Sequence, residues 1–475
     1  MFAYFIVLVA TLCATSAFGQ QIKYYSGNYG GTMIQVGAGV SIVKVNQASF
    51  TGGGGITFNL GSMMTAAQPI VIEVCGLTLS NGAIMYFLGA SSVAGNKPAY
   101  ITVTGVTSNS GGIGLGNGIF PWYTRMIVKS CTYSIDSSAA TFSLFTQYGA
   151  TTPTCLLMGG LTLQKTVVRF HDQNISGSLR NGVYPTRFMN FICSDYSVWM
   201  FDRAKIGVSF AFHGHDPLIT SNGVFLISNI NAVCDRFCIS FEIQVTVSDG
   251  GSFIVEDSTA SADGHDLLFI RGPLTVTNGA FFHANGNYFI TPRYAFSVLS
   301  GATTSGTNTL ISFANNNLLG LPWSFGCSGN CRVQCNMLGQ AQLSTVSQYQ
   351  TAGLNSPSVA ASCDVRTNCP AYTTGCYQAL TASGGTSPNC CVCKPGGYGR
   401  YCLPVELPYI PEMCVATATV PMVTKTHILT QTESISTSAS GRFNQNHDFV
   451  ARTKTLTLTL TVAVTLTPRM TPSPS

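Results

Sequence analysis

The sequence has few charged residues, and this shortage sets the first limits on what the chain can do. Only 9% of its residues are Asp, Glu, Lys or Arg, against about 25% in an ordinary globular domain. The net charge of +5 is spread thinly, with no basic cluster that could follow a phosphate backbone, so we expect no nucleic-acid partner. The polar surface must come from Ser, Thr, Asn and Gly, a mixture that suits strands joined by tight turns.

Long apolar runs are also missing beyond the start of the chain. The opening "MFAYFIVLVATLCATSAFGQ" has a short apolar stretch that ends in small residues, which is typical of a signal peptide over residues 1–19. Because it has no basic first part, an uncleaved anchor is the alternative. We therefore expect an extracellular or cell-surface chain with no transmembrane segment in its mature part.

Helical periodicity is almost absent from residues 20–322, where a phrase of alternating apolar residues recurs instead. It reads "NGVFLISN" (222–229), "GGSFIVED" (250–257), "NGAFFHAN" (278–285) and "NTLISFAN" (308–315). A unit of about 28 residues has room for three short strands, as in "VFLISN", "RFCISFE" and "IQVTVSD". The period predicts an all-β fold, a right-handed parallel β-helix solenoid. An antiparallel sandwich or propeller fits less well, because few tight Asn-Gly hairpins occur.

The residues that close the repeats are candidates for a structural ladder. They are Asn229, Asp257, Asn285 and Asn315. At the corner of each turn, Asn or Asp can adopt a left-handed conformation, and its side chain can bond backbone groups of its own bend or of the next turn. We expect the Phe residues of the same phrases to stack inward along the axis.

Cysteine is concentrated in residues 323–414, which hold 11 cysteines between Cys327 and Cys414. The first three, in "CSGNCRVQC" (327–335), suit a small knot that caps the solenoid. Farther on, "CVCKPGGYGRYC" (391–402) resembles the closing signature of epidermal-growth-factor-like (EGF-like) modules, which places such a module at 363–402. The resemblance implies the bridges Cys363–Cys376, Cys369–Cys391 and Cys393–Cys402, with Cys390 left over. "SPSVAAS" precedes Cys363 in place of acidic and amide ligands, so we expect no calcium and no other cofactor.

The last segment, residues 415–475, is rich in Thr and Ser and low in complexity. Stretches such as "THILTQTESISTSAS" cannot bury enough apolar surface to form a core, and we expect this tail to be disordered or O-glycosylated. The junction "CLPVELPYIPEMC" (402–414), followed by Thr-Lys-Thr runs, resembles the dispersed gene family surface proteins of trypanosomatid parasites. Those proteins are very large surface glycoproteins with β-helical ectodomains and C-terminal membrane helices. The resemblance implies a truncated or compact member.

Catalysis is the main rival to a display function. Carbohydrate-active β-helix enzymes, of the pectinase or lyase type, need carboxylates gathered on one face. The candidate residues are Asp195, Asp202, Asp216, Asp249, Asp257 and Asp266, with Lys205 and Arg271. The ladder explains Asp202 and Asp257 structurally, because Asn replaces them in neighbouring turns, so we expect no catalytic site.

Histidine and cysteine residues offer weaker chemical hypotheses. "FHGHD" (212–216) could bind a metal through His213 and His215, but His265 is distant in sequence and no third ligand is evident, so we expect no metal site. Cys75, Cys131, Cys155 and Cys193 lie in strand-like runs, where we expect most of them to be buried as small hydrophobes, with one bridge as the alternative. Cys234 and Cys238 could bridge across a bend.

One N-glycosylation sequon, "NIS" at Asn174, is expected in an exposed bend. Exposed tyrosines of the cysteine module, Tyr398 and Tyr401, could anchor a ligand or pack internally. Together with the resemblance, these observations predict a non-catalytic, adhesin-like glycoprotein. Its partners would be host extracellular-matrix proteins or glycans, and a further role would be antigenic display.

Overall fold

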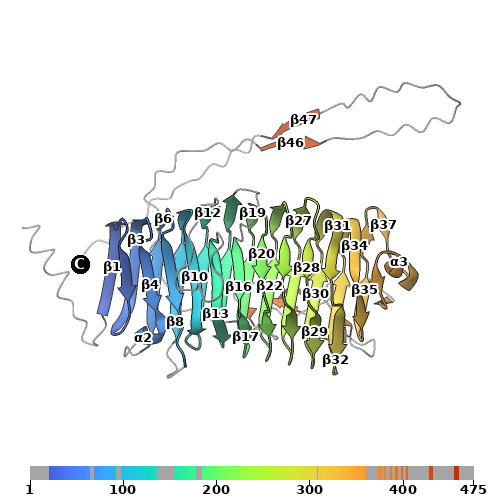
Figure 1. Cartoon of the computed structure of the whole chain (residues 1–475), viewed down its shortest axis with the longest axis horizontal. Coiled ribbons are helices and arrows are strands. Elements are labelled where there is room, and N and C mark those ends of the chain that lie inside the picture. Colours follow the sequence, from blue (N-terminus) through green and yellow to red (C-terminus); the bar gives the residue numbers. More distant parts are fainter. Residues whose placement is uncertain are drawn as a thin grey trace, which may run out of the picture. The chain divides into compact units, whose positions relative to one another are not determined.

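Residues 21–359 form a solenoid of about ten turns whose parallel strands stack along one axis (Figure 1). This computed structural model describes residues 21–64, 69–92, 98–135, 154–177, 185–307 and 309–359, together with the backbone of short strands beyond residue 359. The solenoid begins at β1 (Gln21–Asn28) and ends at β39 (Ser358–Val359). The expected parallel β-helix is therefore confirmed, with almost no α-helix in the described residues.

Each turn contributes strands to flat faces that run the length of the solenoid, which we number in chain order. The first face contains the first half of β3 (Val40–Thr51), β5 (Ile70–Cys75), β8 (Ala99–Thr104), β11 (Arg125–Lys129), β14 (Val167–His171), β18 (Val198–Asp202), β22 (Val224–Ser228), β26 (Ser252–Glu256), β30 (Phe281–Asn285), β33 (Leu310–Ala314), β35 (Cys331–Gln334) and β39. The second face contains the second half of β3, β6 (Thr78–Ser80), β9 (Thr107–Asn109), β12 (Thr132–Ile135), β15 (Asn174–Gly177), β19 (Lys205–Val208), β23 (Asn231–Cys234), β27 (Thr259–Ala262), the starts of β31 (Tyr288–Val298) and β34 (Asn317–Ser328), and β36 (Met337–Leu338).

The remaining strands form two further faces. The third face contains β2 (Met33–Val36), β4 (Gly55–Asn59), β7 (Ile84–Leu88), β10 (Gly112–Ile119), β13 (Leu156–Gln164), β16 (Thr186–Met189), β20 (Phe212–Gly214), β24 (Ile239–Phe241), β28 (Leu268–Ile270), the later parts of β31 and β34, and β38 (Leu354–Asn355). The fourth face starts at the end of β10 and continues through the end of β13, β17 (Ile192–Ser194), β21 (Leu218–Ile219), β25 (Val245–Val247), β29 (Leu274–Thr277), β32 (Ala302–Ser305) and the end of β34.

The prediction of three strands per turn is wrong for the later turns, which have four. In the turn that begins at residue 222, β22, β24 and β25 are the three expected strands, and β23 is the additional one. Its sequence, "NAVC", has little of the β-branched and aromatic enrichment by which strands are recognised. The third and fourth faces of this turn are also short, with three residues each.

Alternating side chains of every face fill the interior. The expected inward stack of aromatic rings is confirmed. Trp199 and Phe225 stack with ring centroids 4.4 Å apart, Phe225 and Phe253 4.7 Å apart, and Phe253 and Phe282 5.1 Å apart. All four side chains are at most 1% exposed. Their offset stacking adds to the free energy gained by burying large apolar surfaces.

The solenoid continues past the predicted boundary at residue 322, which falls inside β34. The predicted cysteine knot at residues 327–335 is instead part of the last turns, because Ile311 of β33 pairs in parallel with Cys331 of β35. A short helix, α3 (Val346–Thr351), follows them, and the antiparallel pair of β36 with β37 (Ala341–Gln342) lies between. Thr345 caps α3 through a capping box with Gln348. An earlier short helix, α2 (Leu60–Met63), follows β4.

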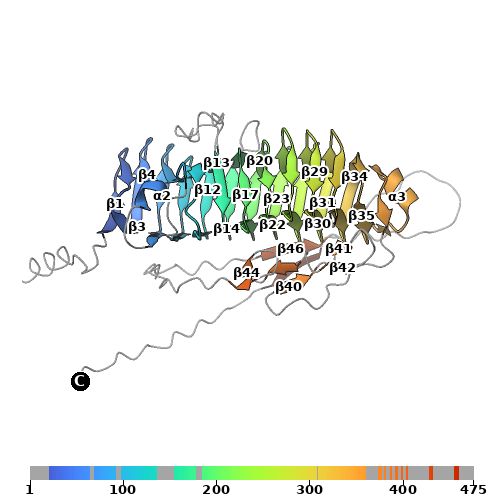
Figure 2. The same cartoon turned by 90° about the horizontal axis from the view of Figure 1, so that it is seen from below.

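Beyond residue 359 the backbone forms short antiparallel pairs. These are β40 (Thr373–Cys376) with β43 (Cys391–Cys393), β41 (Ala379–Leu380) with β42 (Thr386–Ser387), β44 (Gly397–Tyr398) with β45 (Leu403–Pro404), and β46 (His427–Gln431) with β47 (Lys454–Leu458) (Figure 2). The last pair belongs to a separate unit, residues 415–475. The side chains of the predicted EGF-like bridges, and those of Tyr398 and Tyr401, lie outside the described residues. None of the helices described here is both long enough and apolar enough to cross a membrane.

Candidate functional site

The corner between the first and second faces holds three of the four predicted ladder residues. Asn229, Asp257 and Asn315 have φ angles of 51°, 46° and 54°, in the left-handed region that Asn and Asp tolerate. The prediction is wrong for Asn285. This residue is still inside its strand and pairs with Glu256, one position before the corner.

Gly286 occupies the corner that was assigned to Asn285. Its φ is 64°, and a β-carbon at this position would lie 2.4 Å from Oδ1 of Asp257 in the preceding turn. Both the left-handed backbone and the close approach therefore require glycine. The turn that ends at Gly286 is one residue longer than the turn before it, and this insertion shifts Asn285 out of the column.

The amide ladder of the structure is one residue beyond the corner, in a position that faces inward. Asn287, Asn316 and Asn336 are at most 1% exposed. Nδ2 of Asn287 donates to Oδ1 of Asn316 at 2.9 Å, and Nδ2 of Asn316 donates to Oδ1 of Asn336 at 2.9 Å. The backbone N–H groups of Asn287 and Asn316 donate to the same two oxygens. The amides thus satisfy polar groups that the stacking of turns buries.

The ladder continues into the end of the solenoid. The hydroxyl of Tyr349, from α3, accepts a bond from Nδ2 of Asn336 at 3.1 Å and donates to the carbonyl of Leu343 at 3.2 Å. Burial raises the pKa of Tyr349 above its usual value. Sequence reasoning missed this ladder because the repeat was aligned on the exposed corner residues, although "NN" at 315–316 contains both columns.

The candidate carboxylates do not share one place. Asp195 and Asp249 follow strands of the fourth face, whereas Asp202 and Asp257 lie at the end of the first face. A further two residues occupy other corners: Asp216 follows β20 of the third face, and Asp266 precedes β28. These six acids therefore occupy four different corners of the solenoid. An acid–base mechanism needs its groups within hydrogen-bond reach of one reacting bond.

Several of these acids have local partners. The guanidinium of Arg169 holds Asp202 with two bonds of 2.9 Å. Asp249 accepts bonds from Asn278 and Thr220, both 3.0 Å, and these bonds lower the pKa of its carboxyl group. Two further ion pairs are those of Arg293 with Asp266 and of Arg271 with Glu242, each with N and O atoms 3.5 Å apart.

On the outer side of the third face, a column of polar side chains is buried. Arg187, His213 and Ser240 follow one another in register across three turns. They are 7%, 4% and 0% exposed. Nδ1 of His213 lies 3.0 Å from Oγ of Ser240. Burial, and then the positive charge of Arg187, lower the pKa of His213 to about 3, so the imidazole is neutral at physiological pH.

The two histidines of "FHGHD" do not form a metal site with other residues. The rings of His213 and His215 are 6.1 Å apart, while His265 packs its ring 5.0 Å from that of Phe237. In the part of the chain that the structure describes, no group of three or more His, Cys, Asp or Glu side chains is placed to hold a metal ion.

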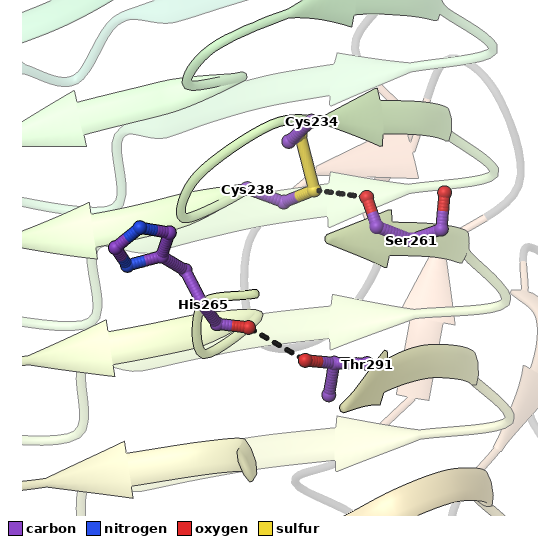
Figure 3. The surroundings of a disulfide bond; sticks show 5 residues. All are labelled: Cys234, Cys238, Ser261, His265 and Thr291. Carbon is purple, nitrogen blue, oxygen red and sulfur yellow. Dashed lines mark hydrogen bonds between the residues drawn. A yellow bond between two sulfur atoms is a disulfide. The ribbon is translucent and has the colours of Figure 1, made fainter. Parts of the chain in front are cut away.

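Cys234 and Cys238 form a disulfide across the bend between the second and third faces (Figure 3). Their Cα atoms are 5.6 Å apart, and Sγ of Cys238 lies 3.3 Å from the carbonyl oxygen of Ser261. In a nearby bend, the hydroxyl of Thr291 donates to the carbonyl of His265 at 2.6 Å.

Most other cysteines of the solenoid behave as buried thiols. Cys131, Cys155 and Cys193 are unpaired and fully buried, and burial raises the pKa of the Cys131 thiol to about 11 and that of Cys193 to about 12. Such thiols are poor nucleophiles, because the reactive form is the thiolate. Cys75, in contrast to these three, is disulfide-bonded.

The sequon residue Asn174 is exposed, but it begins strand β15 and does not lie in a bend. Its side chain therefore points outward from the second face, while the next residue, Ile175, is buried. The strand was missed because Asp172 and Ser176 suggested a bend. Asp172 is in fact the corner residue, with a φ of 55°.

A groove of about 790 Å³ lies beside α3, at the end of the solenoid. Apolar side chains such as Leu321, Leu338 and Leu343 line it together with the uncharged polar residues Thr345 and Gln348, and none of its described lining residues is Asp, Glu, Lys, Arg or His. Its volume is in the range of small-molecule pockets, but the described part of its lining has no group suited to acid–base catalysis at neutral pH.

Comparison with known proteins identifies one region of the chain. Residues 301–403 match the model of the DGF-1 N-terminal domain. The matched region covers the last turns of the solenoid, α3 and most of the predicted cysteine-rich segment. No curated protein and no solved structure matches the chain.

Proposed function

Since its match to the DGF-1 N-terminal domain makes this chain consistent with a dispersed gene family protein of trypanosomatids, we propose that it is a surface or secreted adhesin-like glycoprotein. In this proposal the solenoid presents its faces to host glycans or matrix proteins and to the host's antibodies. It performs no catalysis. The family match and the β-helix are compatible with a surface protein.

The observation that carries the proposal is the contrast between dispersed acids and continuous faces. The candidate carboxylates lie at four corners, and several are held by Arg, Asn or Thr partners. The faces, in contrast, repeat the same outward positions over many turns. A repeated surface suits many weak contacts whose combined affinity exceeds that of each one.

A binding array tests the proposal. The oxidised protein without residues 1–19 would be applied to immobilised neutral glycans, sulfated glycans and matrix proteins, and bound protein would be quantified. We expect saturable binding to at least one class, competed by the same ligand in solution. Binding to none of them would contradict the adhesive function.

The rival carbohydrate enzyme is tested with the same preparation. Uronic-acid polymers would be incubated with the protein, and chain length would be followed by size-exclusion chromatography. We expect no shortening. Shortening that is abolished by Asp216→Asn or Asp249→Asn would establish the enzyme and contradict our proposal.

Surface display is tested in cells. An antibody raised against the solenoid should label intact cells, or the protein should be recovered from the medium. Detection only after permeabilisation would contradict surface display and secretion.

A further inference from the structure

Two buried cysteines flank the bend that leads from the fourth face to the first face near the end of the solenoid. Cys327 lies near the end of β34, and Cys331 is the first residue of β35. Their side chains are 6% and 1% exposed, and both belong to the main core cluster. Only residues 328–330 separate them, so one short bend brings both side chains to the same part of the interior.

The two side chains are in contact. Both residues are unpaired thiols in this structure, and the side chain of Cys331 hydrogen-bonds to that of Cys327. This bond, together with burial, raises the pKa of Cys331 well above its usual value, so its thiol stays protonated at physiological pH. Two neighbouring thiols of this kind are the reduced form of a disulfide.

The bend between the two cysteines is fixed to the preceding turn. The backbone N–H of Asn330 donates to Oγ1 of Thr304 at 2.5 Å, and Nδ2 of Asn330 donates to the carbonyl of Thr309 at 2.8 Å. Gly329 has a φ of 93°, in the region that favours glycine. These contacts hold the backbone on both sides of the bend, so the two sulfur atoms are kept close together.

The solenoid already contains a bridge of the same spacing. Cys234 and Cys238 are also separated by three residues, are 2% and 1% exposed, and form a disulfide with Cα atoms 5.6 Å apart. A bend of this length can therefore meet the geometry that a disulfide requires.

Other partners for Cys327 and Cys331 are hard to reach. Cys335, the next cysteine along the chain, is itself disulfide-bonded. In the described part of the solenoid, the other unpaired thiols lie in much earlier turns: they are Cys131, Cys155 and Cys193.

We propose that Cys327 and Cys331 are oxidised to a second disulfide, which locks the corner before the last turn of the solenoid. The oxidant is a low-molecular-weight disulfide of the glutathione type. The thiolate of one cysteine attacks it, forms a mixed disulfide and releases one small thiol. The second cysteine then displaces the other small thiol, so two protons and two electrons pass from the protein to the oxidant.

Burial determines when this exchange takes place. Since the reactive form is the thiolate and the folded pair is buried and protonated, we expect the bridge to form while the chain folds. The inference goes beyond the proposed adhesive function and uses only the surface or secreted location, where disulfides persist. Both cysteines lie within residues 301–403, the region that matches the family model.

The sequence makes the bridge directly observable by mass spectrometry. Trypsin cleaves after Arg293 and Arg332, and the peptide 294–332 contains Cys327 and Cys331 but no other cysteine. The chain without residues 1–19 would be refolded in a glutathione buffer, denatured in acid, alkylated and digested without reduction. The peptide 188–203, which contains Cys193 as its single cysteine, is the control for a buried thiol that stays reduced.

We expect peptide 294–332 to lack two hydrogen atoms and to take up no alkyl group, while peptide 188–203 is alkylated. In the variant Cys327→Ser, peptide 294–332 should take up one alkyl group at Cys331. In the matched variant Cys193→Ser it should remain bridged. A peptide 294–332 that is alkylated twice, or that is linked to a different peptide, would overturn the inference. Either result would leave the adhesive function untouched, because the binding array tests that function separately.

Discussion

The first and last turns of the solenoid solve the same packing problem with different chemistry. The inward position just after the first corner is apolar in the early turns, where it is occupied by Ala48, Leu77, Val106 and Cys131. In the late turns Asn287, Asn316 and Asn336 hold the same place and bond to one another. The difference teaches that the turn geometry does not itself demand an amide. In the early turns the buried side chain at this position is apolar and packs against its neighbours. In the late turns it is an amide, and its polar atoms are satisfied by hydrogen bonds along the chain of asparagines.

The largest loss of stability is expected when a buried amide of a late turn is replaced by an apolar side chain of the kind found in the early turns. Asn316→Val, which imitates Val106, removes the amide that bonds Asn287, Asn336 and the carbonyl of Ala284. Several buried polar groups would then have no partner, at about 1–3 kcal/mol each. We expect a loss of about 4 kcal/mol in the free energy of unfolding, measured by urea denaturation. A loss below about 1 kcal/mol would mean that an apolar side chain can replace the buried amide in the late turns at little cost in stability.

The reciprocal prediction concerns the apolar half. Leu77→Ala removes a side chain that is fully buried, and the resulting cavity should cost about 3 kcal/mol. No hydrogen bond is broken, so hydrogen exchange should rise locally around the early turns and remain slow in the amide ladder. If hydrogen exchange in the late turns rose equally, the solenoid would unfold as one unit. The early and late turns would then have no separate stabilities to compare.

Acid should destabilise the later turns more than the early turns, because the strongly buried histidines lie in the later turns. Burial lowers the pKa of His213 to about 3 and that of His283 to about 4, whereas both are near 6.5 in the unfolded chain. The unfolded state therefore binds more protons below pH 6.5, and stability is lost as the pH falls. We expect the melting temperature to drop from about pH 6.5 down to about pH 4, and the slope to flatten in His213→Gln/His283→Gln. An unchanged slope in the double variant would assign the acid sensitivity to other groups.

The smallest effects are expected at the exposed corners, where both halves use a left-handed residue. Asn315→Ala should cost about 1 kcal/mol, because alanine tolerates the φ of 54° less well than asparagine. Gln47 occupies the equivalent corner in an early turn with a φ of 50°, and Gln47→Gly should stabilise by up to about 1 kcal/mol. Melting temperatures of the two variants should therefore move in opposite directions. Shifts of the same sign would contradict the role given to the corner backbone.

The type of fold could be predicted from the sequence, but the alignment of residues between successive turns could not. The alternating phrases around Phe225, Phe253 and Phe282 predicted stacked strands and an inward aromatic stack, because periodicity two and repeated length are visible in one chain. The position of Asn285 could not be predicted in this way. One extra residue in its turn moves it from the corner into the strand, and such an insertion appears only when the pairing with Glu256 is known.

In the candidate site, too, some features could be predicted from the sequence and others could not. Local sequence was enough to propose the short bridge between Cys234 and Cys238, whose cysteines lie across one bend. It could not show that Arg187, His213 and Ser240 share a column, because each comes from a different turn and their relation depends on how three turns are aligned. The boundary at residue 322 was placed too early for a similar reason. Frequent cysteines marked a change in composition, whereas the strands continue through it to Val359.

By itself, then, the amino-acid sequence determined that the chain would wind into short stacked strands with a dry aromatic interior and left-handed corners, since these follow from local alternation and from residues that tolerate positive φ. The tertiary structure decided which residues meet in the fourth face, in the buried amide chain and in the pairs that hold the acids. These depend on register between turns, where a shift of one residue exchanges the inside of the solenoid for its surface.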